Sequence, residues 1–171
     1  MVEYIWRGGE EVPMHLDIRQ VHGILMTPEG RILLRIKNGS YRLTGGHPEP
    51  EDANEEATLI RESLEEADCE ISHIHYLGYQ EVQGDGEPYA QVRMVALIDK
   101  INPATPDPDR TRNWIYGRIL VSPGEAIRIL PFGDINEKLV NAAVAVAREQ
   151  KLCDFSNLET ELINEESRDK E

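Results

Sequence analysis

Short runs of apolar and β-branched residues alternate with turn-forming residues along most of the chain, a pattern that is typical of β-strands. Residues 16–26 and 31–36 flank a Thr-Pro-Glu-Gly sequence, which predicts a β-hairpin. Residues 71–82 and 89–98 flank a glycine-containing loop and predict a second antiparallel pair, and residues 114–121 predict a further strand. The first two thirds of the chain is therefore expected to be dominated by β-structure.

Residues 52–68 break this pattern, because they contain neither glycine nor proline. Ala57, Ile60, Leu64 and Ala67 recur there at the period of an α-helix, which predicts an amphipathic helix that buries this stripe. The helix is expected to end at the aspartate at position 68, because aspartate tolerates the left-handed conformation.

Two more helices are predicted near the end of the chain. Ser122 is a suitable N-cap for a short helix, with Pro123 at its first position, and a longer helix with a wide apolar stripe is expected from Asp134. Strands, a helix, strands and two final helices predict an α+β fold, an α/β/α sandwich with helices on both faces of a mixed sheet.

The 171 residues suit one compact domain with short extensions. We expect residues 1–15 to form an N-terminal arm or edge strand, which makes a homodimer plausible. Residues 16–152 should form the domain itself. Residues 153–171 are polar and acidic and are interpreted as a mobile tail, in which Leu158, Leu162 and Ile163 allow at most a weak docking helix.

The formal net charge of −14 argues against direct binding to nucleic acid. No apolar run is long enough to span a membrane and the start does not resemble a signal peptide, so we expect a cytoplasmic protein without a membrane partner. Two cysteines cannot form a disulfide framework.

Residues 49–70 hold ten of the acidic residues and a single arginine, so this segment needs a chemical explanation.

Glu62, Glu65 and Glu66 fall on one side of the predicted helix. Such a set of charges often only faces water, but here Gly45 and Gly46 precede the helix and allow a close approach of the backbone. Carboxylate oxygens that converge in this way suit Mg²⁺ or Mn²⁺ with a bound phosphate.

These residues resemble the Nudix box, Gly-x5-Glu-x7-Arg-Glu-U-x-Glu-Glu-x-Gly-U, where U is apolar. The Arg-Glu-x-x-Glu-Glu core is intact at residues 61–66, and the order of the predicted elements is similar to the Nudix fold over residues 16–150. The spacing before Arg61 is one residue too long, and Asp52 and Asp68 replace the glutamate and the final glycine. This leaves open the roles of Glu51, Asp52 and Glu55, of which the resemblance implies Asp52 or Glu51 as the ion-pair partner of Arg61.

The resemblance implies a hydrolase that cleaves a nucleoside diphosphate linked to another moiety, with Mg²⁺ or Mn²⁺ as cofactor. Glu62, Glu65 and Glu66 would be the metal ligands, with the Gly46 carbonyl as an additional one. Arg61 would orient these carboxylates. Glu62, or an acid outside the box, would accept a proton from the attacking water.

Further candidates lie outside the core of the box. The outside acid is sought among Asp85, Glu87, Asp107 and Asp109. Substrate contacts are sought among the following residues: Tyr41, Arg42, Gly45, Gly46, His47, Glu87, Arg93 and Trp114.

Two alternative functions stay open. One is a Nudix-like module that binds a nucleotide without hydrolysing it. The other is a prenyl-diphosphate isomerase, which would need an acid or base such as Cys69 or Cys153 in the pocket.

Overall fold

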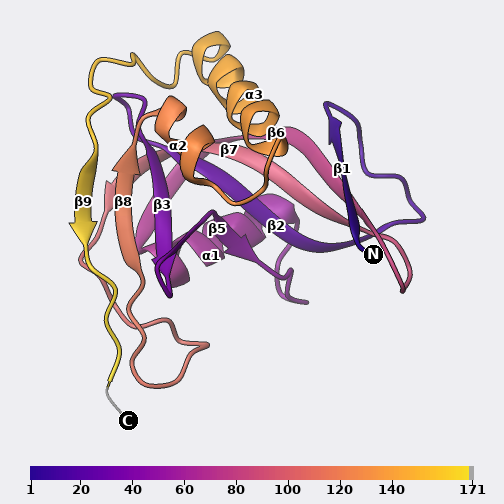
Figure 1. The fold of residues 1–171 in the computed structure, drawn as a ribbon, viewed down its shortest axis with the longest axis horizontal. Helices are drawn as coiled ribbons and strands as arrows, with labels where there is room; N and C mark the ends of the chain where they lie inside the picture. Colours follow the sequence, from indigo (N-terminus) through magenta and orange to yellow (C-terminus); the bar gives the residue numbers. More distant parts are fainter. Residues whose placement is uncertain (170–171) are drawn as a thin grey trace.

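The computed structural model describes residues 1–169 and contains one mixed β-sheet with three α-helices (Figure 1). In chain order the elements are β1 (Glu3–Gly8), β2 (Asp17–Met26), β3 (Ile32–Lys37), β4 (Ser40–Arg42), β5 (Thr44–Gly46), α1 (Glu55–Ala67), β6 (Cys69–Gln83), β7 (Tyr89–Ile101), β8 (Gly117–Val121), α2 (Pro123–Ile129), α3 (Ile135–Glu149) and β9 (Glu161–Asn164). The predicted strands and helices are all present. None of the described helices is long and apolar enough to cross a membrane.

The main path through the sheet is β1-β6-β7-β2-β3-β8-β9, and β2 and β7 are the only strands within residues 1–169 that pair in parallel. Strands β2 and β3 pair only at Leu25↔Leu33 and Met26↔Ile32. Beyond these two pairs the strands diverge, since β2 continues against β5 and β3 continues against β4. The sheet therefore opens between its two central strands.

Apolar side chains of the strands alternate between two cores, as the two-residue period of a strand requires. In β2, Val21 and Leu25 pack in the core that includes Leu59 of α1, while Ile24 and Met26 pack in the core that includes Leu139 of α3. Helix α1 thus covers one face, and α2 and α3 cover the other (Figure 1). This confirms the predicted α/β/α sandwich.

The buried side of α1 differs from the prediction. Ile60 and Leu64 are 42% and 45% exposed, whereas Leu59 and Ser63 are fully buried. The side of the helix that carries Glu62 faces the sheet. A helical period ranks residues only by their own polarity. It could not show that Arg35 and Gly46 of the sheet lie against Glu66 and Glu62.

The C-terminal segment also differs from the expected tail. Residues Glu161–Asn164 form β9, which pairs antiparallel with β8, and Asn164 Oδ1 accepts a hydrogen bond from Arg118 Nε at 2.7 Å. The edge of β8 offers unpaired backbone groups, which a short strand satisfies even when its own sequence is polar. Residues 170 and 171 of the predicted tail lie outside the described residues.

Candidate active site

Helix α1 begins and ends at defined caps, which fix the position of its carboxylates. The Asn54 side chain accepts a hydrogen bond from Ala57 N at 2.8 Å. Asp68 ends the helix in the left-handed conformation, as predicted, with φ of 51°. Its carboxylate also accepts a hydrogen bond from Thr105 N at 2.9 Å, which attaches the loop after β7 to the end of the helix.

The Glu62 side chain lies directly against Gly46. A Cβ atom built on Gly46 would lie 2.5 Å from Glu62 Oε1, which is closer than real Cβ contacts. Glu62 is only 7% exposed. Gly45 is needed for a different reason: its φ is 154° and an added Cβ would lie 2.1 Å from the Val21 carbonyl oxygen. Gly46 therefore leaves room for the Glu62 carboxylate, and Gly45 allows β5 to pack against β2.

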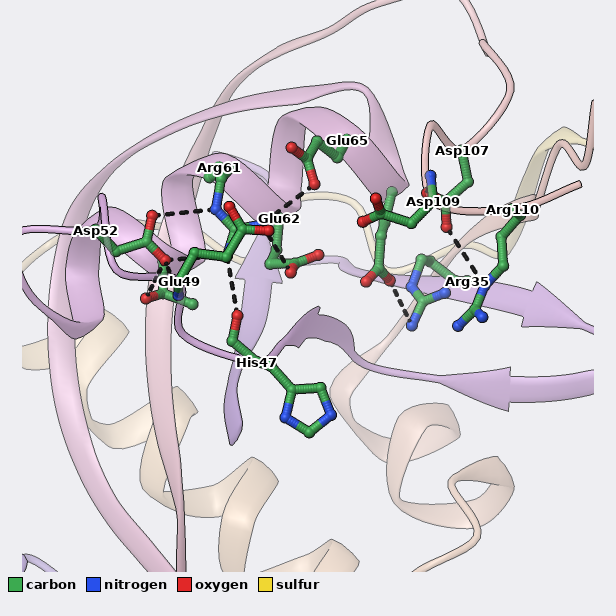
Figure 2. Close-up of polar contacts among 12 residues, drawn as sticks. Arg35, His47, Glu49, Asp52, Arg61, Glu62, Glu65, Asp107, Asp109 and Arg110 are labelled. Carbon is green, nitrogen blue, oxygen red and sulfur yellow. Dashed lines mark hydrogen bonds and ion pairs between the residues drawn. The ribbon is translucent and has the colours of Figure 1, made fainter. Parts of the chain in front are cut away.

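Arg61 is the centre of the carboxylate network (Figure 2). Its Nη1 lies 3.0 Å from Glu62 Oε1 and 3.2 Å from Glu65 Oε2. Its Nε and Nη2 donate to the two oxygens of Asp52, at 3.1 and 3.0 Å, and Nη2 also donates to the His47 carbonyl oxygen at 3.0 Å. One guanidinium thereby ties the loop before the helix to two of the three glutamates.

Asp52 is the acid before the helix that pairs with Arg61, despite the longer spacing. Its Oδ2 also accepts hydrogen bonds from Glu49 N at 2.9 Å and from Thr58 Oγ1 at 2.8 Å. The hydrogen bonds from Arg61 and from the Glu49 backbone hold the pKa of Asp52 well below its usual range. The loop before α1 therefore accommodates the extra residue of the box without loss of this ion pair. Glu49 forms a further ion pair with Arg61, at 3.4 Å.

Glu66 pairs with a second arginine, which the sequence did not single out. Arg35 Nη2 of β3 lies 2.7 Å from Glu66 Oε2 and donates to the Leu43 carbonyl oxygen at 2.9 Å. Burial raises the pKa of Glu66, the Arg35 charge opposes this, and the neighbouring Glu62 carboxylate raises it further. Glu62 and Glu66 therefore form a close pair of acids that a cation would stabilise.

The loop after β7 brings two of the candidate outside acids to the box. Figure 2 shows Asp109 beside the carboxylates of α1, and its charge is among the causes that raise the pKa of Glu65, after burial, which is the largest. Asp107 is buried and already accepts hydrogen bonds from Tyr116 Oη and Asp109 N. Of the two, Asp109 is therefore the more available as a proton acceptor.

Other predicted residues lie apart from the carboxylates. Asp85 and Glu87 are exposed in the loop between β6 and β7. The His47 ring points away from the glutamates in Figure 2, and only its carbonyl contacts Arg61. Trp114 donates to Glu166 at 2.8 Å.

A cavity of about 700 Å³ lies where β2 and β3 diverge. Its lining includes Tyr41, Arg42 and Arg93, which were predicted from the sequence as substrate contacts. It also includes residues that were not predicted: Gln20, His22, Arg35, Gln80, Gln91 and Phe132. No distinct signal in the sequence marks these residues, because polar residues at alternate positions of a strand are the ordinary pattern of a sheet with one solvated face. Arg35 both lines this cavity and pairs with Glu66, so the cavity adjoins the box.

The cysteines do not support an isomerase. Neither Cys69 nor Cys153 lines the cavity, and burial raises the pKa of each thiol to about 11. A thiol with this pKa is a poor source of thiolate near neutral pH.

The donor set fits a divalent cation of the magnesium type. It consists of hard carboxylate oxygens, a backbone carbonyl at a residue without a side chain, and a buried Glu66 oxygen whose contact with Arg35 lacks the alignment of a hydrogen bond. Within residues 1–169 no three acidic, histidine or cysteine side chains are already gathered around one point. Arg61 Nη1 stands between Glu62 Oε1 and Glu65 Oε2 and contacts both.

Comparison with known proteins agrees with this arrangement. No protein-family model matches the sequence, and no curated protein matches it. Solved structures do match, among them a Bacillus subtilis pyrophosphohydrolase, BsRppH, with a TM-score of 0.61 and 20% identity over 87% of this chain and 90% of that one. A Caenorhabditis elegans Ap4A hydrolase gives 0.53 and 16% over 77% and 98%, and a NUDIX hydrolase from Nitrosomonas europaea gives 0.56 and 17% over 76% and 90%.

The fold and the arrangement of the box define the class: this chain has the Nudix fold. At these identities the likeness establishes the fold, which confirms the resemblance drawn from residues 45–69.

Proposed function

We propose that the protein is a Mg²⁺-dependent hydrolase that cleaves a nucleoside diphosphate linked to another moiety, with Mn²⁺ as an alternative cation. The observation that carries the proposal is the packing of Glu62 against Gly46, on the same side of α1 as Glu65 and Glu66. Burying acidic side chains is costly unless a cation or hydrogen bonds compensate them. A structural role would be served equally well by apolar residues, so this cost indicates a function.

In this proposal Glu62, Glu65, Glu66 and the Gly46 carbonyl hold the cation. When bound, Mg²⁺ polarises phosphoryl oxygens and lowers the pKa of a water molecule. Arg61, held by Asp52, positions the carboxylates and returns to them when the cation leaves. Glu62 or Asp109 accepts the proton of the attacking water, and Arg35 and Arg42 face the negative charge of the phosphates.

The test is hydrolysis of a panel containing nucleotide sugars, dinucleoside polyphosphates, ADP-ribose and nucleoside triphosphates, with and without Mg²⁺. Release of phosphate or nucleoside monophosphate that requires the cation supports the proposal. Saturable binding without any product would favour the alternative of a nucleotide-binding module. One observation favours this alternative: Arg61 contacts Glu62 and Glu65 and so occupies two of the proposed metal ligands.

A further inference from the structure

The cavity beside the box is positively charged in a protein of strongly negative charge. Its lining includes Arg35, Arg42 and Arg93 and no aspartate or glutamate, although the chain has 32 acidic residues and a net charge of −14. Low-dielectric walls that carry one sign of charge concentrate the electric field in a cleft. Glu66 compensates the charge of Arg35, but no ion pair described for residues 1–169 involves Arg42 or Arg93, so the ligand of this cavity is expected to be anionic.

Arg93 is the most unusual of the three arginines. It is only 4% exposed, and no carboxylate in the described part of the chain lies within ion-pair distance of it. Its Nη2 donates to Gln80 Oε1 and Gln91 Oε1, both at 2.9 Å, and its Nη1 donates to the Val92 carbonyl oxygen at 3.2 Å. All these acceptors are neutral, so the charge of a buried guanidinium is left uncompensated.

The neighbours of Arg93 present donors to the same space. Gln80 and Gln91 are paired across β6 and β7, and both use Oε1 to accept from Arg93. No hydrogen bond described for residues 1–169 uses the Nε2 group of either side chain, which leaves both as donors. His22 pairs with Arg93 across β2 and β7, and its Nδ1 lies 3.3 Å from Arg93 Nη1, which favours the tautomer with the proton on Nε2.

An uncompensated buried charge is costly and is normally paired or removed. Burial lowers the pKa of Arg93 to about 10, so the group nevertheless carries its charge at neutral pH. Nη1 and Nη2 of Arg93 already have acceptors, so Arg93 contributes its charge and its Nε–H. Together with the neighbouring amide and imidazole donors, these match the oxygens of a phosphate. The missing partner of Arg93 is then supplied by the ligand.

We propose that this cavity, with Arg93 as its anchor, binds a phosphate group of the substrate in addition to the two phosphates at the cleaved linkage. This inference rests on the proposed function for the position of those two phosphates, because Arg35 connects the cavity to Glu66. It narrows the substrate class to nucleotides with a further phosphate.

The first experiment measures anion binding without catalysis, so its outcome does not depend on hydrolysis. Binding of tripolyphosphate is titrated calorimetrically in metal-free buffer at constant ionic strength, for the wild type, Arg93→Met and Arg128→Gln. The last variant removes the same charge from an exposed site on α2, where Arg128 pairs with Glu125. We expect saturable binding to the wild type and to Arg128→Gln, and about 10- to 100-fold weaker binding to Arg93→Met.

Equal affinity of the wild type and Arg93→Met for tripolyphosphate would overturn the proposal. Equal binding of malonate and tripolyphosphate would overturn the assignment to phosphate, because a dicarboxylate would then serve as well. The melting temperature of Arg93→Met without an anion should stay close to that of the wild type, because removal of the unpaired buried charge offsets the loss of the hydrogen bonds to Gln80 and Gln91. A large loss of stability would show instead that Arg93 is structural.

A second measurement needs no variant. Tripolyphosphate should slow amide hydrogen exchange in residues 89–101 of the wild type. Slowing confined to residues 49–67 would overturn the proposal, because the anion would then lie at Arg61.

Once a substrate is known, nucleotides that differ only by one added phosphate complete the test. The wild type should prefer the phosphorylated member in kcat/KM, and Arg93→Met should lose about tenfold or more of that preference. No preference in the wild type would overturn the narrower substrate class, while hydrolysis of both members would leave the hydrolase proposal intact.

Discussion

Gly46→Ala isolates the contact between the glycine loop and Glu62. The added Cβ would lie 2.5 Å from Glu62 Oε1 and 2.7 Å from Glu62 Cδ, whereas an ordinary contact begins at 3.4 Å. The carboxylate must therefore move by about 1 Å. The φ of Gly46 is not in the left-handed region, so alanine introduces no backbone strain.

The magnitude of the effect should differ between folding and catalysis. Glu62 is displaced at the far end of a flexible side chain, so we expect the free energy of unfolding to fall by only about 1 kcal/mol, the low end of the range for overpacking. A misplacement of about 1 Å in a catalytic group costs on the order of 100-fold in rate. Activity should thus fall far more than stability.

The assay compares kcat of wild type, Gly46→Ala and Gly86→Ala on a substrate found in the panel, with melting temperatures and Mn²⁺ affinity in parallel. Gly86 is the matched control, because an added Cβ there meets no atom within 4 Å. Wild-type activity and Mn²⁺ affinity in Gly46→Ala would refute the placement of Glu62 in the cation site. If the activity of Gly46→Ala fell only in proportion to its fraction of folded protein, that result would also refute the placement of Glu62 in the cation site.

Three further changes test other parts of the site. Glu65→Gln should lower kcat by about 100-fold or more with little change in melting temperature, because the Glu65 side chain is 29% exposed. Asp52→Asn should lower the free energy of unfolding by about 1–3 kcal/mol at neutral pH, because it breaks hydrogen bonds between charged groups. The pKa of folded Asp52 is depressed, so its stabilisation is complete above its ordinary pKa and is lost as the pH falls below about 4 towards the folded pKa. Denaturant unfolding from pH 7 to pH 2 should show the two curves converge. Glu166→Ala removes the acceptor of Trp114 Nε1 and should speed hydrogen exchange in residues 102–116.

Controls separate these effects from general changes in charge. Glu56→Gln alters an exposed acid in the first turn of α1 and should leave kcat unchanged. Parallel curves for wild type and Asp52→Asn down to pH 2 would contradict the assigned pKa. Unchanged exchange in Glu166→Ala would show that the C-terminal segment does not hold the loop that carries Asp109.

Sequence alone determined the features that depend on local order. Strands β2, β3, β6, β7 and β8, the three helices, the end of α1 at Asp68 and the grouping of Glu62, Glu65 and Glu66 follow from period, caps and motif spacing. These signals lie within a few residues of one another, so no distant partner is needed to interpret them.

Only the tertiary structure decided which side of α1 is buried and which groups surround the carboxylates. Arg35 reaches Glu66 from β3, and His22, Gln80 and Arg93 come together across three strands. The polar C-terminal segment becomes a strand because the edge of β8 lies beside it. Each of these results depends on long-range pairing, and a polar residue in a strand gives no sign by itself of whether it meets water, another chain segment or a ligand.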